Sequence, residues 1–549
     1  MKLTARIGLI GILILTACIY AMSLRNGFVN LDDPMLVTEN KHVQQASLEN
    51  IAYVFSHFDP ELYIPITFLT YQLETWTLGP AAWHFHLFSL ILHIIATWLV
   101  FEIVKRLSRS NGIGLMTALL FAVHPINAEA VLWVSARKDV LSAVFFLTSL
   151  LCLLLYKANE KRRWYYLSLG LFGLALGSKV TVVTLPIILI ALSGKPKNLK
   201  EWMKHIGPFL LLAVIFGMIA IAGKGAVNEQ FYYIDFILMS MRSTFFYLML
   251  IVAPAGQSAI HAIKPHDLYA PILPVAIGIV TLASWIVIRF QKRFPLVLAG
   301  WTFFLVTLAP SFLHYTRGNE NFMLGSERYM YLPSIGIFLI IAVLIDTLWK
   351  ESWITRPTRL VLAVCATLIV LVLSYLTVLR TFVFEDAVIF SIDILQKNPD
   401  DGRTWYNLGI ALEAESKPME AEEAYLTALK AKPNLADAAI NLGLLFLREG
   451  RTQEGIAMLE QATTVRPDYF KGYFNLGVAL QNTGRFSEAE TAYRKTIELF
   501  PDFPMARRNL ATVLGAQRKF SEAMTEYELL AEIDPGFRAE FEHLKAKIR

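Results

Sequence analysis

The chain contains little cysteine. Its three cysteines in 549 residues, Cys18, Cys152 and Cys365, each lie within an apolar run. This placement excludes a disulfide framework as the basis of the fold, and none of the three resembles a metal ligand. Cysteine usage therefore gives no indication of the redox compartment.

Charge is also scarce. Asp, Glu, Lys and Arg make up 17% of the residues, and the formal net charge is only +5, whereas soluble domains average roughly 25% charged residues. The Lys and Arg residues cluster in short loops, which is typical of topology signals in membrane proteins and not of a nucleic-acid-binding surface. With 55% hydrophobic residues, the chain belongs to the membrane class.

Long apolar runs, by contrast, recur up to about residue 380 and then stop. They predict an all-α membrane body at residues 1–380 with about eleven spans. The candidate spans are 7–24, 85–104, 113–133, 139–156, 164–177, 180–193, 206–222, 272–289, 294–310, 331–349 and 359–379. A lipoprotein cleavage box at Leu15–Cys18 would remove the first span. The apolar stretch continues past that box, so we expect the helix to be kept.

The basic residues assign the loops to two sides of the membrane. Lys2 and Arg6 place the N-terminus inside, and the later basic clusters also fall inside if 164–193 is two short helices that turn near Lys179. Eleven spans then put the C-terminal part outside, in the periplasm or an organelle lumen. A further apolar segment, 238–253, would break this parity as a full span, so we interpret it as a re-entrant or interfacial helix.

This topology places loops 25–84, 134–138 and 311–330 on the outer face. The first loop carries Asp32 and Asp33. Repulsion between two adjacent carboxylates should raise one pKa, which suits a general base that removes a proton from a hydroxyl. The alternative is a helix N-cap or a turn, which is common for Asp before Pro.

Ionisable residues also interrupt the third span. His124 and Glu129 lie within an apolar stretch, where such groups usually face a polar cavity; alternatively, they form a buried pair that ties helices together. Arg137 and Asp139 follow in the short outer turn. His, Glu and Asp together make a divalent metal a candidate cofactor, although their spacing matches no strong metal motif.

Cations on the same face are candidates to bind a phosphate. Lys179 lies at the break of the predicted helix pair, Arg328 at the membrane edge, and Arg242 near the start of 238–253. The alternatives are a lysine that snorkels to the interface and an ion pair between Arg328 and its neighbour Glu327. Together with the carboxylates, these cations indicate transfer from a lipid-phosphate donor.

In their order along the chain, these motifs resemble those of a known family. The acidic pair, the stretch from His124 to Val131, Ser178-Lys179 and the Glu-Arg-Tyr-x-Tyr-Leu-Pro-Ser stretch are similar to those of the transmembrane and tetratricopeptide-repeat-containing protein O-mannosyltransferases. The resemblance covers nearly the whole chain. Residues 135–139 depart from the pattern, because they read Ser-Ala-Arg-Lys-Asp in place of a Gly-Arg-Ala-Asp-like motif.

The resemblance implies a type C glycosyltransferase fold and a sugar donor linked to polyprenyl phosphate. It implies that Asp32 or Asp33 is the catalytic base for attack by a Ser or Thr hydroxyl, with inversion at the sugar. The residues expected to bind the donor phosphate are Lys179, Arg328, Arg242 and Arg137, and those expected to support the site are His124, Glu129, Asp139 and Glu327.

After residue 385 the sequence repeats every 34 residues, the period of the tetratricopeptide repeat. We predict a domain at 385–549 that comprises a half repeat at 385–399, repeats at 402–435, 436–469, 470–503 and 504–537, and a capping helix at 538–549.

One asparagine recurs on the first helix of each unit, at the position that usually faces the concave groove. The four are Asn407, Asn441, Asn475 and Asn509. This arrangement resembles the superhelix of the O-GlcNAc transferase, where such asparagines hold extended peptide, and an amide pairs with peptide groups of any sequence. The alternative is a structural hydrogen bond within the repeats.

We therefore interpret the chain as an integral membrane glycosyltransferase, most consistent with a bacterial inner membrane. It would move a mannose-like hexose from polyprenyl phosphate to Ser or Thr of a polypeptide on the periplasmic side. Two alternatives stay open: a non-catalytic scaffold that recruits protein partners through its repeats, and a transferase that acts on a glycan or lipid acceptor.

Overall fold

The computed structural model describes residues 3–58, 62–193, 199–223, 233–264, 267, 269–314, 322–539 and 541–542. The chain divides into two compact units, Met1–Lys397 and Asn398–Arg549. Both are built from helices, and the sheet in the described residues is one short antiparallel pair, β1 (His261–Ile263) with β2 (Phe322–Gly325), in which His261 lies opposite Gly325.

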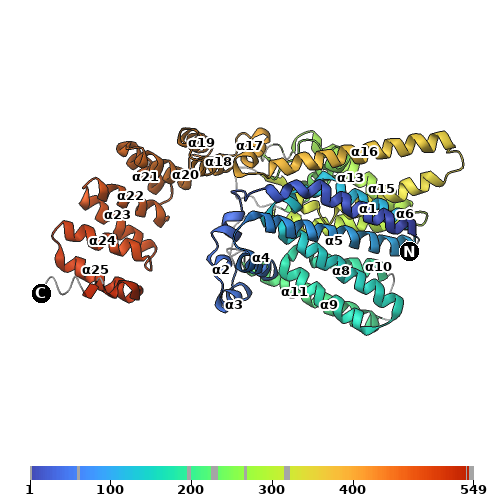
Figure 1. Cartoon of the computed structure of the whole chain (residues 1–549), viewed down its shortest axis with the longest axis horizontal. Coiled ribbons are helices and arrows are strands. Elements are labelled where there is room, and N and C mark those ends of the chain that lie inside the picture. Colours follow the sequence, from blue (N-terminus) through green and yellow to red (C-terminus); the bar gives the residue numbers. More distant parts are fainter. Residues whose placement is uncertain are drawn as a thin grey trace. The chain divides into compact units, whose positions relative to one another are not determined.

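Long helices of the first unit run side by side (Figure 1). Its α-helices are α1 (Leu3–Tyr20), α2 (Lys41–Gln44), α3 (Leu48–Ser56), α4 (Pro65–Leu78), α5 (Ala82–Ser108), α6 (Asn111–Val123), α7 (Ala128–Leu132), α8 (Arg137–Asn159), α9 (Arg162–Ser178), α10 (Leu185–Ser193), α11 (Leu199–Gly223), α12 (Tyr233–Val252), α13 (Ile272–Arg289), α14 (Pro295–Leu308), α15 (Ser334–Lys350), α16 (Arg356–Val383) and α17 (Ala387–Lys397).

Shorter helical turns join these helices near the candidate site. They are η1 (Ala21–Arg25), η2 (Pro34–Thr38), η3 (Pro125–Asn127), η4 (Val134–Ala136), η5 (Val180–Thr184), η7 (Ala309–His314) and η8 (Glu327–Met330).

Eight helices among the described residues are long and apolar enough to cross a membrane, or nine if one bent pair counts as a span. Eleven spans were expected. The predicted spans 164–177 and 331–349 correspond to α9 and α15, which have 17 residues each, and 180–193 corresponds to the short apolar segment Val180–Leu192. These three helices are therefore too short to meet the length criterion on their own.

Segment 238–253 was not predicted to be a full span, but it meets the criteria for one. Helix α12 is one continuous helix of 20 residues, and Ile234–Val252 meets the length and hydropathy criteria for a span. The structure therefore provides a candidate span where we expected a re-entrant or interfacial helix. That expectation depended on eleven spans that keep all basic loops on one side, and the spans found in the described residues do not make up that set.

The bent pair consists of α6 and α7. A proline within a helix removes a hydrogen bond and clashes with the preceding turn, and Pro125 lies two residues beyond the last residue of α6. His124 stabilises the break, because its Nδ1 accepts a hydrogen bond from the N–H of Ile126 at 3.1 Å. The helices bend by 59° at this point, and the bend turns Glu129 on α7 toward the loops.

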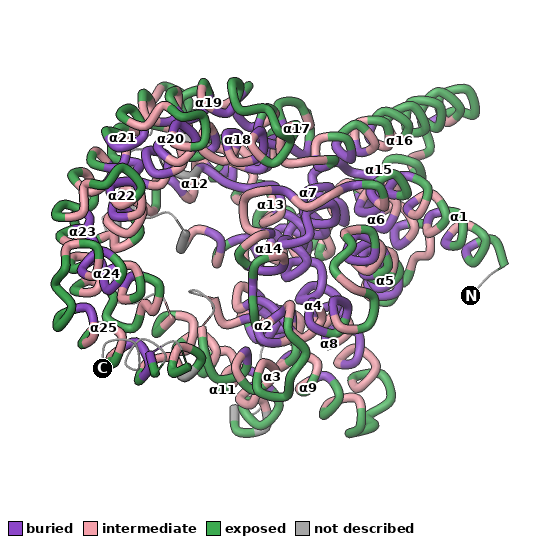
Figure 2. The backbone as a smooth tube through the Cα atoms, turned by 60° about the vertical axis from the view of Figure 1, so that its left-hand side comes forward, coloured by how far each residue is buried: buried purple, intermediate pink, exposed green. Residues whose placement is uncertain are grey.

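Exposed apolar side chains cover the outer helices of the first unit. Helix α16 is exposed along most of its length and α1 along one face (Figure 2), and only 11% of the apolar window of α16 is buried. At least half of the surface of Leu360, Val364 and Ile369 is exposed, at 67%, 50% and 56%. Such surfaces are expected of helices that face lipid.

The second unit consists of paired antiparallel helices, as predicted for tetratricopeptide repeats. The pairs are α18 (Gly402–Ala414) with α19 (Pro418–Ala431), α20 (Ala436–Arg448) with α21 (Thr452–Val465), α22 (Phe470–Asn482) with α23 (Phe486–Leu499), and α24 (Pro504–Ala516) with α25 (Phe520–Ile533). Small residues allow the helices of a pair to approach closely: a Cβ at Gly409 or Gly477 would overlap the ring of Tyr425 or Tyr493. Most of the predicted capping helix lies outside the described residues.

Candidate active site

The acidic loop begins at the end of α1 and is fixed by the end of α16. The side-chain amide of Asn26 donates to the carbonyl of Thr381 at 2.9 Å, and the N–H of Gly27 donates to the carbonyl of Glu385 at 2.8 Å. These bonds tie the first residues of the loop to a segment more than 350 residues away.

Asp33 is buried within this loop, with 1% of its surface exposed. Its carboxylate accepts hydrogen bonds from the N–H of Val29 and the N–H of Ser135, both at 2.9 Å, and from the Ser135 hydroxyl. Burial raises the pKa of Asp33 from 3.8 to about 6, and repulsion from Asp32 is only a minor cause. A raised pKa was expected, but from repulsion and not from burial.

Asp32 differs from its neighbour because its side chain is 31% exposed. Its Oδ2 lies 3.9 Å from the ammonium of Lys138, which in turn donates to the carbonyl of Ser135 at 2.8 Å. The acidic pair is therefore divided: Asp33 is occupied by protein donors, and Asp32 is the carboxylate that another molecule can reach.

A small polar cavity of about 30 Å³ is lined by Asp139, Lys179 and Arg328, and Asp32 of the acidic loop acts electrostatically on Arg328. Asp139 of α8 and Lys179 before η5 form an ion pair on its wall, and Lys179 also lies over the ring of Tyr329 at 5.1 Å. The second carboxylate oxygen of Asp139 is buried and accepts no hydrogen bond. The cavity therefore offers a cation and an unused acceptor at the same place.

Arg328 of η8 lines the same cavity. It is held by Glu129, which accepts a hydrogen bond from its guanidinium at 2.7 Å and another from its backbone N–H at 3.1 Å. The ring of Trp133 lies 4.6 Å from the guanidinium. Asp32 and Asp139 both act electrostatically on Arg328, and Arg328 and Lys179 both act on Lys138. Three cations and three carboxylates are thus gathered at one end of the body.

Two of the four predicted phosphate-binding cations do not join this group. Arg137 is fully buried; it forms two bonds to Glu74, donates to the carbonyl of Phe85 at 2.9 Å, and lies over three aromatic rings. The expectation that Arg137 binds the donor phosphate is therefore wrong. Arg242 donates instead to the carbonyl of Asp267, and no described contact brings it to the cavity.

The expected supporting residues have distinct roles. His124 is buried, and its Nε2 lies 3.0 Å from the carbonyl of Ile251, so it ties helices together. The described contacts do not show the alternative of a buried pair between His124 and Glu129, because Glu129 pairs with Arg328. The alternative of an ion pair between Glu327 and Arg328 is wrong, because Arg328 pairs with Glu129 and Glu327 pairs with Arg380 at 3.7 Å.

Three residues near the site were not singled out from the sequence. Lys138 and Ser135 lie in the stretch that was noted for Arg137 and Asp139, and a lysine at the start of an apolar run was a usable signal. Arg380 also lies near the end of an apolar run, α16, yet nothing local marks its partners, which are distant in the sequence.

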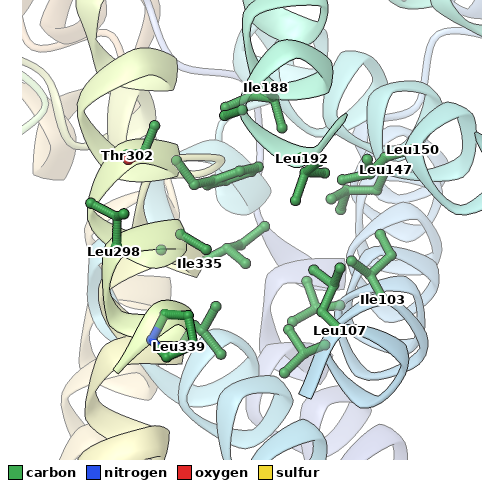
Figure 3. A pocket seen from close by; sticks show the side chains of 17 residues that line it. Ile103, Leu107, Leu147, Leu150, Ile188, Leu192, Leu298, Thr302, Ile335 and Leu339 are labelled. Atoms are coloured by element: carbon green, nitrogen blue, oxygen red, sulfur yellow. The ribbon is translucent and has the colours of Figure 1, made fainter. Parts of the chain in front are cut away.

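A large apolar cavity of about 310 Å³ lies between helices of the first unit (Figure 3). Ile103 and Leu107 of α5, Leu147 and Leu150 of α8, Ile188 and Leu192 of α10, Leu298 and Thr302 of α14, and Ile335 and Leu339 of α15 surround it.

The apolar cavity and the polar cavity are lined by different residues of the same structural elements. Helices α8 and α14, the η5–α10 segment and the η8–α15 segment line both. Gly300 and Gly336 let α14 and α15 approach closely, since a Cβ on either would overlap the backbone of the other. A ligand with one charged end and one apolar end would fit this pair of cavities.

Metal ligands are not grouped in the described part of the chain. No three His, Cys, Asp or Glu side chains there lie close enough to hold a metal ion together. The polar chemistry described above therefore consists of ion pairs between carboxylates and cations.

The repeat asparagines are all partly exposed, but they have different partners. Asn509 donates to the hydroxyl of Tyr493 at 3.3 Å, and Asn441 likewise bonds with Tyr425. Asn475 donates instead to the carbonyl of Lys471 in its own helix at 2.9 Å. Asn441 and Asn509 thus bond with a tyrosine of the preceding repeat, and Asn475 makes a hydrogen bond within its own repeat, which is the alternative that the sequence left open.

The helices and the sites define a class: a polytopic membrane body followed by a tetratricopeptide-repeat domain. The family of dolichyl-phosphate-mannose-protein mannosyltransferases matches residues 65–222, and the tetratricopeptide repeat matches overlapping stretches from 393 to 536.

Curated relatives match about three quarters of this chain. Protein O-mannosyl-transferase TMTC3 of Homo sapiens is 24% identical over 77% of this chain and 51% of its own length. Protein O-mannosyl-transferase F38B6.6 of Caenorhabditis elegans is 25% identical over 75% of this chain and 59% of its own length. The chain spans about half the length of the curated relatives it matches. Along about three quarters of its length the chain is therefore similar to the TMTC protein O-mannosyl-transferases.

Solved structures match the repeats. The crystal structure of MamA protein aligns with 27% of this chain and 81% of its own, at 23% identity and a TM-score of 0.26.

Proposed function

We propose that this chain transfers a hexose from a polyprenyl-phosphate donor to Ser or Thr hydroxyls of a polypeptide. The observation that carries the proposal is the polar cavity with Asp139, Lys179 and Arg328 next to a large apolar cavity on the same four elements. A polyprenyl-phosphate sugar has one charged group and one long apolar chain, so it matches both.

The donor's phosphate would bind at Lys179 and Arg328. Lys179 is buried and is oriented by Asp139; Arg328, with 12% of its side chain exposed, is oriented by Glu129. A cation held in place before the reaction stabilises charge without reorganising. Arg328 also offers a planar guanidinium, which suits phosphate oxygens. The polyprenyl chain would follow the apolar cavity, whose described lining contains a single polar side chain, that of Thr302.

Asp32 is the proposed general base. The acceptor hydroxyl oxygen would attack the anomeric carbon, and Asp32 would take the hydroxyl proton. As the new C–O bond forms, the bond from the anomeric carbon to the phosphate oxygen breaks and polyprenyl phosphate leaves as an anion beside Lys179 and Arg328. The sugar passes through an oxocarbenium-like state, and a single displacement inverts its configuration.

The names of the relatives support mannose as the sugar and protein as the acceptor. We propose that the reaction takes place on the periplasmic or lumenal side, because Lys2 and Arg6 predict an inside N-terminus and the acidic loop follows the first span. The repeats would bind the acceptor polypeptide, since amide side chains on partly exposed helix faces pair with peptide backbone.

The apolar cavity provides a direct test. Ala299 lines it, and Ala283 lines a separate apolar groove of about 460 Å³ on the same body. Ala299→Phe should raise the KM for polyprenyl-phosphate mannose about tenfold, since displacing about two methylenes of the chain weakens binding by about 1.6 kcal/mol. Ala283→Phe is the matched control and should leave it unchanged.

The assay uses the full chain reconstituted in liposomes, with a Ser/Thr-rich peptide as acceptor. Equal KM values for both variants would contradict the proposed donor site. Transfer that is absent from the wild type, with peptide binding retained, would favour the scaffold alternative. Transfer to glycan or lipid but not to peptide would favour the alternative of a transferase that acts on a glycan or lipid acceptor.

A further inference from the structure

Arg380, near the end of α16, joins two carboxylates from different parts of the body. Its side chain is 7% exposed, and its guanidinium lies 3.7 Å from Glu327 of η8 and 3.1 Å from Asp393 of α17. It also donates to the carbonyl of Gln257 at 3.3 Å. A chain of charges thus leads from α17, the helix that precedes the repeats, to the residue adjacent to Arg328.

Glu327 is completely buried, so its charge needs partners. The N–H of Ser258 donates to Oε1 at 2.6 Å, and His261 lies 3.4 Å from the same oxygen. Oε2 accepts no hydrogen bond and faces the guanidinium of Arg380. Since Glu327 directly precedes Arg328, these contacts fix the backbone on which Arg328 is carried.

A second route from α17 ends at the same guanidinium. The ring of Phe390 packs against Trp133, with 5.8 Å between centroids, and Trp133 lies 4.6 Å from the guanidinium of Arg328. The polar route through Arg380 therefore ends at Glu327, the residue before Arg328. The aromatic route through Trp133 ends at the guanidinium of Arg328 itself.

The same junction also holds the acidic loop. Thr381 and Glu385 accept the hydrogen bonds from Asn26 and Gly27 that fix the start of this loop. Residues 380–393, which we name the α16–α17 junction, thus contact both the loop that carries Asp32 and the turn that carries Arg328.

We propose that Arg380 is a positioning residue for the donor site, and that the α16–α17 junction transmits the state of α17 to Arg328. The inference rests on the proposed function for its kinetic consequence. Arg380 touches neither sugar nor phosphate in this scheme; it acts through Glu327. Helix α17 is the last helix of the first unit and precedes the first repeat in the sequence.

A double-mutant cycle tests the role of Arg380. Arg380→Met leaves Glu327 buried without its cation and should raise the donor KM about tenfold or more, with the acceptor KM within about twofold. Glu327→Gln/Arg380→Met removes the unpaired charge and should recover most of that loss. Arg380→Lys keeps the positive charge, and its donor KM should lie between those of the wild type and Arg380→Met. A lower melting temperature with an unchanged donor KM would show a merely structural role and overturn the proposal.

A matched pair on α17 tests the connection itself and remains informative if Arg380→Met does not fold. Asp393→Asn removes a carboxylate that faces Arg380. Asp386→Asn changes the residue that caps the same helix through the N–H groups of Val388 and Ile389, and Asn is also a good cap. Asp393→Asn should raise the donor KM about threefold to tenfold, and the control should not.

Hydrogen exchange separates this inference from the proposed function. Backbone amides of residues 326–330 should exchange faster in Asp393→Asn than in Asp386→Asn, whether or not sugar is transferred. Faster exchange without any transfer by the wild type would retain the connection and reject the proposed reaction. Equal exchange in the two variants would reject the connection even if the wild type is active.

Discussion

Asp33 and Ser135 are joined by two hydrogen bonds across 102 residues of sequence: the backbone N–H of Ser135, at 2.9 Å, and its hydroxyl both donate to the same carboxylate oxygen. Asp33 therefore ties the acidic loop to the start of α8. Asp32 is left partly exposed beside Lys138. Two adjacent residues of the same type thus have separate tasks, one in structure and one, we propose, in catalysis.

Substitution of the two aspartates should separate these tasks. Asp32→Asn should lower kcat by about 100-fold or more, which is the usual contribution of a general base, without changing the melting temperature. Asp33→Asn should lower the melting temperature, because an amide cannot accept all the hydrogen bonds that Asp33 receives. The measurements are transfer from a lipid-linked sugar and thermal unfolding in detergent.

The folded fraction of Asp33→Asn provides the control. Its kcat should stay within about tenfold of the wild type if Asp33 is not the base. Loss of activity in Asp33→Asn together with full activity in Asp32→Asn would reverse the assignment.

The raised pKa of Asp33 predicts a dependence of stability on pH. Its value is about 6 in the folded protein against 3.8 as the reference, so the folded state holds the proton more tightly. This contribution, roughly 3 kcal/mol, is fully present below about pH 4 and is lost as the pH rises through about 6. The stability advantage of the wild type over Asp33→Asn should therefore shrink between these pH values.

Thermal unfolding of both proteins from pH 4 to pH 7 checks this dependence. Other groups titrate equally in the two proteins, so the difference between them isolates Asp33. A difference in melting temperature between the wild type and Asp33→Asn that widens as the pH rises would contradict a raised pKa of Asp33.

Some of this site could be predicted from the sequence, because adjacent carboxylates and isolated cations next to apolar stretches are conspicuous. Asp32 was selected as part of an acidic pair in an outer loop, and Lys179 and Arg328 as cations at a helix break and at the membrane edge. The structure brings all three close enough to Lys138 to act on it electrostatically. Arg137 carried the same signal but was misinterpreted. Its partner Glu74 lies 63 residues away, and no local pattern indicates which distant carboxylate will neutralise a buried cation.

The same contrast applies to the fold. The repeats depend on contacts between neighbouring helices, so a period of 34 residues predicts the helix pairs closely. The spans depend on where helices break and how much other helices cover them. Helices α9 and α15 have 17 residues each, and hydropathy alone did not distinguish them from full spans.

Arg137 and Glu74 should behave as a structural pair. Arg137→Met or Glu74→Gln alone leaves a buried charge or dipole without its partner and should lower the free energy of unfolding by about 3–5 kcal/mol. The double variant should be less destabilised than the sum of the two. Thermal unfolding measures this coupling, and a donor KM that rises in the folded Arg137→Met protein would instead restore Arg137 as a phosphate ligand.

The repeat asparagines should differ in what they bind, because their neighbours differ. Tyr425 and Tyr493 donate to Glu413 and Gln481 in their own repeats and bond with the asparagine of the next repeat. At the equivalent position before Asn475 the chain has Leu459, which has no hydroxyl. The amide of Asn475 is therefore engaged only by the carbonyl of Lys471 in the contacts described, and an extended peptide can displace that bond.

Asn475→Ala should weaken binding of a labelled Ser/Thr-rich peptide about twofold to tenfold, which corresponds to one lost hydrogen bond, with an unchanged melting temperature. Asn441→Ala and Asn509→Ala should instead lower the stability by about 1 kcal/mol, because they remove bonds between repeats. Fluorescence anisotropy and thermal unfolding of the three variants separate the two effects. Equal losses of stability at all three positions would mean that the asparagines serve the solenoid and that other side chains hold the acceptor.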